Sequence, residues 1–450
     1  MKRIDFEKGT VTGNILNAAI PMLVAQILNL LYNIVDRVYI ARIPEVGTAA
    51  LGAVGLCFPL VVIITAFANL FGSGGAPLFS IKRGMSDDRA ANTIMNMSFT
   101  MVCTFAVVFT ALCMIFAKPL LIVFGASENA LKYALPYLLI YLIGTLPSMI
   151  STGMNPFINA QGYSTTGMLS VAIGAVANLV LDPLFIFGFN FGIKGAAIAT
   201  VSAQALSVVF AVVLLIKKKL PFTITKKDFR LNPQCRRFLK IGLPLALQEF
   251  LTQISFLALC AFVNRLGLEA SSGYGVACKI VNFAMLVPSS LMQSMASFVS
   301  QNVGAGKPKR ARKSMLTGIG VGLSVGCLVF ILILLKGDVL AGFFSTDAGV
   351  IQKGFDYLKG FAPETLVTAV LFSMIGYFNG NNQTIWVMVQ GLVQTLLVRL
   401  PMAYFMSIQP DASLTKIGLA APVSTTVGII LNIGFFLYFT RAKKEIVSEE

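Results

Sequence analysis

The sequence contains no histidine and few charged residues of either sign. The lack of histidine excludes His-based metal sites, His-dependent catalysis and proton relays through imidazole. Any proton that this chain moves would therefore have to be carried by carboxyl groups. Only 12% of the residues are charged, whereas about 25% is usual in soluble domains. A soluble globular protein is thus a poor description of this chain.

Cysteine is also sparse, and its spacing indicates no chemistry. Six of the seven cysteines lie in apolar runs, Cys235 lies in a basic segment, and no CxxC pair occurs. Neither a disulfide framework nor a zinc site is expected, and the cysteines are interpreted as small packing residues. The sequence also lacks a GxxxxGK[ST] motif, so ATP is not expected to supply energy. We expect no cofactor beyond a coupling ion.

What the sequence has in abundance is long apolar runs, since 56% of its residues are hydrophobic. A run of about 20 apolar residues is long enough to cross the hydrocarbon core of a bilayer as a helix. The fold class expected is therefore an all-α polytopic membrane protein. About twelve such runs occur, at residues 14–40, 48–76, 90–117, 130–152, 162–190, 195–216, 238–264, 271–301, 311–335, 354–377, 385–408 and 415–440.

The net charge of +16 is explained better by membrane orientation than by nucleic-acid binding. With the N-terminus inside, most Lys and Arg residues fall in cytoplasmic segments, as the positive-inside rule requires. We therefore expect a protein of the cell membrane with both termini in the cytoplasm. No cleavable signal peptide is expected, because the first apolar run is too long for one. No soluble domain is left to bind nucleic acid.

The chain is expected to consist of two related halves. The basic segment 217–237 separates an N-lobe, residues 1–216, from a C-lobe, residues 238–450, with about six spans in each. IPMLVAQ, which begins at Ile20, corresponds to LPLALQE from Leu243, and GAAIATVSA from Gly195 corresponds to GLAAPVSTT from Gly418. Transporters with parallel repeats bind substrate between the halves and alternate access by rocking them.

Two aspartates in the N-lobe runs are the main candidates for function. Asp182 lies in the apolar stretch NLVLDPLFIF, and Asp36 lies near the end of the first run. An ionisable residue inside a membrane span is by default a hypothesis for a functional site. The repeat places Leu259 and Leu400 at the corresponding C-lobe positions. The fold that the two halves share therefore does not itself require these acids. Both should lie at similar heights in the outer half of the bilayer.

Residues around Asp182 support this interpretation. Asn178 precedes it by one helical turn, on the same face. Pro183 lacks an N–H group, so we expect it to free the carbonyl of Leu179 and bend the helix. Two carboxyl groups close together in a low dielectric exchange protons as a unit. When protonated the pair can donate hydrogen bonds, and when deprotonated it can bind an organic cation or Na⁺. A proton and a cation that compete for one such site can be exchanged across the membrane, which is the simplest form of antiport.

The chain resembles the multidrug and toxic compound extrusion (MATE) family. The motif YNIVDRVYIAR from Tyr32, the segment Asn178–Pro183, and GAAIAT, which ends at Thr200, carry the resemblance, which extends over the whole chain. It is most similar to the DinF-like prokaryotic branch. The resemblance implies two pseudo-symmetric six-helix lobes that export cationic or amphipathic compounds in exchange for H⁺ or Na⁺. We expect a monomer whose partners are these compounds and the lipid bilayer.

The same resemblance implies roles for individual residues. The proton or Na⁺ site would consist of Asp36, Asn178, Asp182 and Thr200, and Tyr32, Pro21 and Asn155 would line the pocket. Glu249 lies about a turn from an acid that other members carry in span seven, and Glu364 lies near the start of span ten. Span ten itself has no carboxylate where those members have one, which weakens the case for a C-lobe ion site.

Structural interpretations of these residues stay open. Asp36 could neutralise Arg37, Asn178 could serve only as a helix–helix hydrogen bond, and Glu249 could pair with Lys279 or Arg399.

Two other function classes also stay open. A lipid-linked precursor flippase of the same superfamily would have extra spans and several central arginines. A membrane-embedded enzyme would need paired catalytic acids in a span. The adjacent acids Asp87 and Asp88 lie instead in a basic turn beside Arg89.

Overall fold

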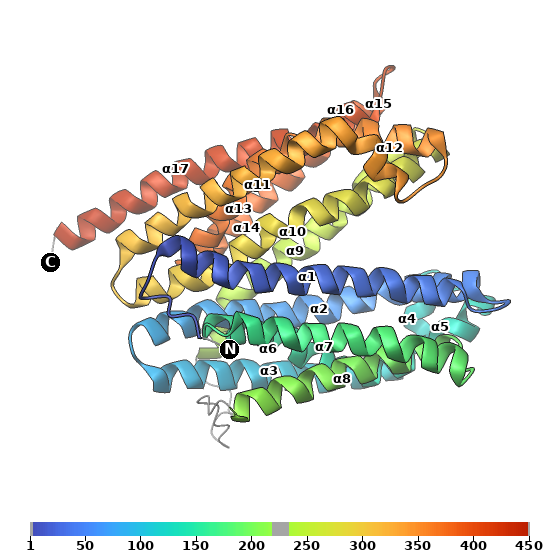
Figure 1. The fold of residues 1–450 in the computed structure, drawn as a ribbon, viewed down its shortest axis with the longest axis horizontal. Coiled ribbons are helices and arrows are strands. Elements are labelled where there is room, and N and C mark those ends of the chain that lie inside the picture. The colour runs from blue at the N-terminus through green and yellow to red at the C-terminus, as the bar shows by residue number, and fades with distance from the viewer. Residues whose placement is uncertain (1–2, 218–233, 449–450) are drawn as a thin grey trace. The chain divides into compact units, whose positions relative to one another are not determined.

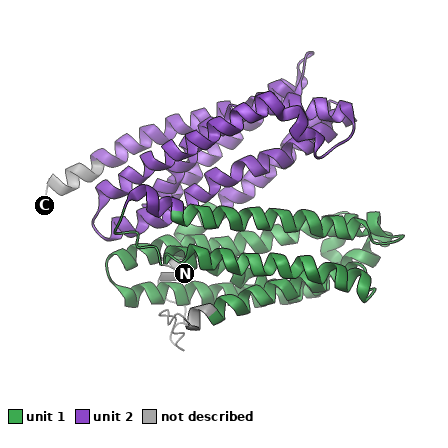
Figure 2. Ribbon diagram, in the orientation of Figure 1, with its two compact units in different colours: residues 1–9, 17–246 green, residues 10–16, 247–450 purple. Residues whose placement is uncertain are grey.

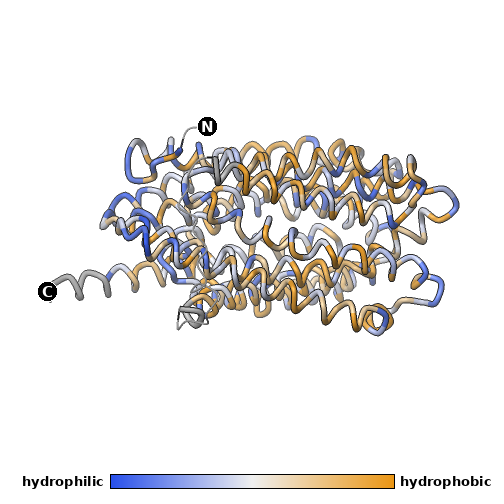
Figure 3. The backbone as a smooth tube through the Cα atoms, turned by 90° about the horizontal axis from the view of Figure 1, so that it is seen from below, coloured by the Kyte–Doolittle hydropathy of each residue, from blue (hydrophilic) through white to orange (hydrophobic). Residues whose placement is uncertain are grey.

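The computed structural model describes residues 3–217 and 234–448, and in these residues every regular element is a helix (Figure 1). The expected linker at 217–237 lies largely outside the described residues. Hydrophobic residues run along the helices, while hydrophilic residues gather at helix ends and turns (Figure 3). Only helices and closed barrels satisfy their own backbone hydrogen bonds in lipid, so this pattern is that of a multi-pass membrane protein.

The chain forms two compact units (Figure 2). Unit 1 comprises Met1–Gly9 and Asn17–Ala246, and unit 2 comprises Thr10–Leu16 and Leu247–Glu450. The division between the units thus falls inside two helices, α1 (Val11–Ala41) and α9 (Gln234–Asn264).

Unit 1 is built from the first eight α-helices and the start of α9. After α1 come α2 (Gly47–Gly84), α3 (Asp88–Ile115), α4 (Ala117–Val123), α5 (Glu128–Ile143), α6 (Thr145–Ala160), α7 (Ser164–Pro183), the π-helical segment η1 (Leu184–Gly188) and α8 (Ile193–Lys217).

Unit 2 continues from α9 to the end of the chain. Its elements are α10 (Leu268–Gly304), α11 (Pro308–Gly342), α12 (Ala348–Phe361), α13 (Glu364–Gly380), α14 (Thr384–Leu392), the π-helical segment η3 (Val393–Arg399), α15 (Leu400–Ile408), α16 (Leu414–Gly418) and α17 (Ala420–Ser448).

Two of the expected spans are bent rather than continuous. Ten helices in the described residues are long and apolar enough to cross a membrane, or up to twelve if each bent pair counts as one span. The pair α5 and α6 bends by 54°, and the pair α12 and α13 bends by 50°. The first break lies at Gly144, a weak helix former, and the second at Pro363, which lacks an N–H group. The sequence predicted single runs at 130–152 and 354–377, and the apolar pattern alone does not reveal the bends.

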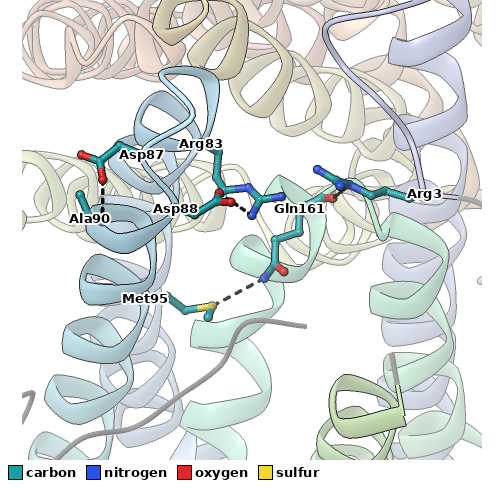
Figure 4. A network of polar contacts seen from close by, with 7 residues as sticks. All are labelled: Arg3, Arg83, Asp87, Asp88, Ala90, Met95 and Gln161. Atoms are coloured by element: carbon teal, nitrogen blue, oxygen red, sulfur yellow. Dashed lines mark hydrogen bonds and ion pairs between the residues drawn. The ribbon is translucent and has the colours of Figure 1, made fainter. Parts of the chain in front are cut away.

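The adjacent acids of the α2–α3 turn have structural roles. Asp87 caps α3 by accepting a hydrogen bond from the N–H of Ala90, and Asp88 forms an ion pair of 2.8 Å with Arg83 (Figure 4). A carboxylate at a helix N-terminus satisfies otherwise free N–H groups. These contacts account for both acids without catalysis.

The N-terminal segment is fixed to the turn between α6 and α7. The Arg3 side chain donates to the carbonyl of Gln161, at 3.3 Å (Figure 4), and the N–H of Ile4 donates to the carbonyl of Gly162, at 2.9 Å. Gly162 has φ +83°, and a Cβ there would meet the Ile4 carbonyl oxygen at 2.2 Å. The turn therefore needs glycine both for its backbone conformation and for this contact.

The helices of unit 1 approach one another closely where small residues meet. A Cβ added at Gly72 of α2 would lie 2.4 Å from the carbonyl oxygen of Gly153 on α6. Small residues that let helix backbones approach are typical of packing in membranes. This contact joins α2 to the second arm of the bent pair α5 and α6.

We expect Gly72→Val to destabilise the protein by about 1–3 kcal/mol, because the added carbons would force α2 and α6 apart. Gly55→Val is the matched control on the same helix, since nothing lies within 4 Å of a Cβ at Gly55. Thermal unfolding of the purified protein in detergent measures both. Equal melting temperatures for the two variants would contradict the close approach.

Candidate functional site

The two aspartates singled out from the sequence interact directly in unit 1. Asp36 lies on α1 and Asp182 lies at the end of α7, and their carboxyl groups lie close enough to interact electrostatically. The Asp182 side chain is completely buried. An ionised carboxylate has only acceptor atoms, so two neighbouring carboxyl groups can hydrogen-bond to one another only when one of them carries a proton. The close approach therefore fits a pair of groups that hold a proton jointly.

Asn178 and Thr200 complete a polar cluster with Asp182. The Asn178 amide donates to Asp182 Oδ1 at 3.2 Å and to Thr200 Oγ1 at 3.4 Å. The Thr200 hydroxyl itself donates to the carbonyl of Ala196 at 3.0 Å, one turn back on α8. Together with Asp36, these residues make a group of four that comes from three sequence motifs and lies on three helices.

Local backbone features bring these helices together. Asn178 and Asp182 lie one turn apart on α7, and the helix changes from α to π immediately after Pro183. Proline removes a hydrogen-bond donor, which favours such a change. A Cβ at Gly195 would meet the backbone of Phe185 in η1 at 2.6 Å. Glycine at this position lets α8 approach η1, and Thr200 follows one and a half turns later.

The cluster contains oxygen atoms that are suited to a cation. Asp36 Oδ1, Asn178 Oδ1 and Asp182 Oδ2 are buried and have no hydrogen-bond donor. Carboxylate, amide and hydroxyl oxygens are the ligands that hard cations prefer. The described residues contain no group of three His, Cys, Asp or Glu that could hold a metal. A bound Na⁺ would therefore depend on the amide and hydroxyl oxygens as well as the two acids.

Tyrosines surround the carboxyl pair, and sequence reasoning identified only one of them. Tyr32 lies one turn before Asp36 and interacts electrostatically with both aspartates. Tyr137 and Tyr141 of α5 are buried, stack with ring centroids 6.1 Å apart, and both lie within electrostatic range of Asp36.

A signal for the missed tyrosines exists in the sequence. Tyr133, Tyr137 and Tyr141 recur at four-residue intervals in one apolar run. That spacing places them on one helix face. It gives no indication, however, that this face lies against the two aspartates.

Two other predicted pocket residues lie elsewhere in unit 1. Pro21 is in the interior of α1, about 22 Å along the helix from Asp36 at 1.5 Å per residue. The Asn155 side chain donates to the carbonyl of Gly167 at 3.3 Å and accepts from Asn159 at 2.8 Å. Asn155 therefore fixes α6 to the first turn of α7. The structure groups Tyr32, but not these two residues, with the carboxyl pair.

The candidate acids and bases of the C-lobe form a different arrangement. Glu249 lies on the part of α9 that belongs to unit 2. Lys279 lies with its Nζ 5.4 Å from the ring centroid of Phe344. Glu364, which is only 7% exposed at the start of α13, interacts electrostatically with Arg399. It directly follows the bend between α12 and α13.

Known proteins with similar sequences include a multidrug export protein and a transporter. A family model described as MatE matches residues 21–184 and 244–405. The chain is 23% identical to the multidrug export protein MepA of Staphylococcus aureus over 86% of each chain. It is 25% identical to the probable multidrug resistance protein YpnP of Bacillus subtilis over 89% of each, and 26% identical to an FAD transporter of Shewanella oneidensis over 75% of each.

Solved structures show the same fold. An outward-facing multidrug resistance MATE family transporter superposes with a TM-score of 0.91, at 21% identity over 99% of both chains. A transporter of Pyrococcus furiosus from the same superfamily, described as having a binding pocket of reverse polarity, superposes with a TM-score of 0.90 at 22% identity over 99% of both chains. Since the family model covers both halves, including the segment from Tyr32 to Pro183, this chain belongs to the MATE family of multidrug efflux transporters and is a transporter rather than an enzyme.

Proposed function

We propose that this protein is a secondary active antiporter that exports cationic or amphipathic organic compounds in exchange for protons at Asp36 and Asp182. The observation that carries the proposal is the close approach of these two carboxyl groups on helices that are long and apolar enough to span a membrane. The multidrug export proteins among the relatives support the substrate class.

The pair would have two states that differ in charge. With a proton shared between them, Asp36 and Asp182 satisfy one another and attract a cation less strongly. Without that proton, two negative charges face each other in a low dielectric, where repulsion is strong. A positively charged substrate offsets this repulsion as a proton does. Proton and substrate therefore compete for one site, and each drives the release of the other.

The neighbouring side chains would support the deprotonated state. The Asn178 amide donates to Asp182, which stabilises charge on that carboxylate. The aromatic rings of Tyr137 and Tyr141 stack on one another and lie near Asp36, and aromatic faces attract organic cations. Na⁺ is the alternative coupling ion, because the buried oxygens of Asp36, Asn178 and Asp182 without donors fit its preferences.

We expect Asp182→Asn to abolish proton-coupled efflux while the protein still folds. The substitution is nearly isosteric and its amide oxygen can still accept from Asn178, but it cannot gain or lose the coupling proton. Efflux of a fluorescent organic cation from vesicles with imposed proton or sodium gradients measures coupling. FAD, which gives the transporter of Shewanella oneidensis its name, is the anionic comparison substrate.

Asp338→Asn is the control, since this aspartate is exposed on α11. If Asp182 were only one half of a structural pair, its replacement would lower stability by about 3–5 kcal/mol. A well-folded Asp182→Asn variant that transports at the wild-type rate would remove this residue from the mechanism.

We expect the pH dependence of substrate binding to reside in unit 1. Binding of an organic cation should strengthen as pH rises and the pair loses its proton. Asp36→Asn should flatten this dependence. Glu249→Gln, a change in unit 2, should alter affinity or stability and leave the pH dependence in place. Titration of cation binding by the purified protein at several pH values measures each curve. The reverse pattern, flat for Glu249→Gln and unchanged for Asp36→Asn, would place coupling in unit 2.

A further inference from the structure

A second buried carboxylate, Glu364, lies at the end of a chain of hydrogen bonds in unit 2. Thr425 of α17 donates to Glu364 Oε1 at 2.8 Å, and Gln394 donates to the Thr425 hydroxyl at 3.0 Å. Gln390 in turn donates to Gln394 at 2.6 Å. Since an amide nitrogen can only donate, the Thr425 proton is left to point at Glu364. Every donor in the chain is therefore directed toward this carboxylate, which is the arrangement that an ionised acceptor favours.

One residue of this series of hydrogen bonds, Gln394, lies in the π-helical segment η3. Gln394 is the second residue of η3, and Arg399 is its last. Long π-helical segments are rare, and they often occur at functional sites. Pro401 follows closely and lacks an N–H group, so the carbonyls of the preceding turn lose a partner. Gly428 on α17 provides space, because a Cβ there would lie 2.6 Å from the Gln390 amide.

Glu364 is connected to both ends of η3. Through Thr425 it contacts Gln394 at the beginning, and through charge it interacts with Arg399 at the end. The Arg399 guanidinium also lies 5.2 Å from the ring centroid of Phe256. Tyr357, Tyr274 and Cys278 also interact electrostatically with Arg399.

We propose that the Glu364 carboxylate is a charge clamp that holds η3 in its π-helical form, and that loss of this charge releases the segment. Without the carboxylate, Arg399 would lose its electrostatic interaction with Glu364, and Thr425 would lose a charged acceptor. Both ends of η3 would then be free to adjust toward α-helical pairing. The clamp lies wholly within unit 2, so it is independent of the coupling proposed for Asp36 and Asp182.

Hydrogen–deuterium exchange of the full-length protein in nanodiscs tests the clamp, because exchange reports local opening. We expect Glu364→Gln and Arg399→Gln each to raise the exchange rate of peptides from 390–399 by about tenfold, the size expected for a hydrogen bond to a charged group. Exchange in α11 should stay at the wild-type rate. In the double variant the two effects should be less than additive, because each single change already breaks the same interaction. Glu269→Gln, which changes an exposed acid of the same unit, is the control.

Wild-type exchange at 390–399 in Glu364→Gln, or additive effects in the double variant, would overturn the proposal. If Glu364→Gln also raises the exchange rate in α11, the substitution has disturbed the unit more widely. Thr425→Val is then the more specific test, because it removes one hydroxyl group and leaves both charges in place. The clamp then predicts faster exchange around Gln394 with Arg399 still protected. Unchanged exchange around Gln394 in that variant would also overturn it.

Discussion

The cost of placing an ionised carboxyl group in a medium without water is the constraint on which this structure depends. Each uncompensated charge in an apolar interior lowers the free energy of unfolding by on the order of several kcal/mol. The helices therefore carry few acids, and the buried ones have partners. Asp182 has Asp36 and Asn178, and Glu364 has Thr425 and the charge of Arg399. The two units thus compensate their buried carboxyl groups with different partners.

In unit 1 the partner of a carboxyl group is another carboxyl group, which leaves a site whose charge can vary. In unit 2 the acid accepts a hydrogen bond from a hydroxyl group and interacts electrostatically with a guanidinium. A π-helical segment accompanies each arrangement. It follows Pro183 in unit 1 and precedes Pro401 in unit 2. In both halves the proline lacks an N–H group, which weakens the helix beside it.

The apolar runs and their lengths predicted the helical membrane fold, and the MATE membership was recognised from motifs in spans one, five and six. The bends at Gly144 and before Glu364 were missed, because hydropathy does not distinguish one straight helix from two that meet at an angle. Spacing along the chain placed Asn178 beside Asp182, and the repeat comparison isolated both aspartates. The tyrosines of α5 were missed because their role depends on which helix they face, and that is a property of packing rather than of sequence.

The central claim is that Asp36 and Asp182 exchange a proton for a substrate cation, and proton release on binding tests it most directly. Tetraphenylphosphonium added to the purified protein in weakly buffered solution should release up to about one proton per bound cation, because the pair holds a proton as a unit. The release should disappear in Asp36→Asn. Cation binding by the wild-type protein with no proton release, at any pH at which the protein is folded, would contradict the account.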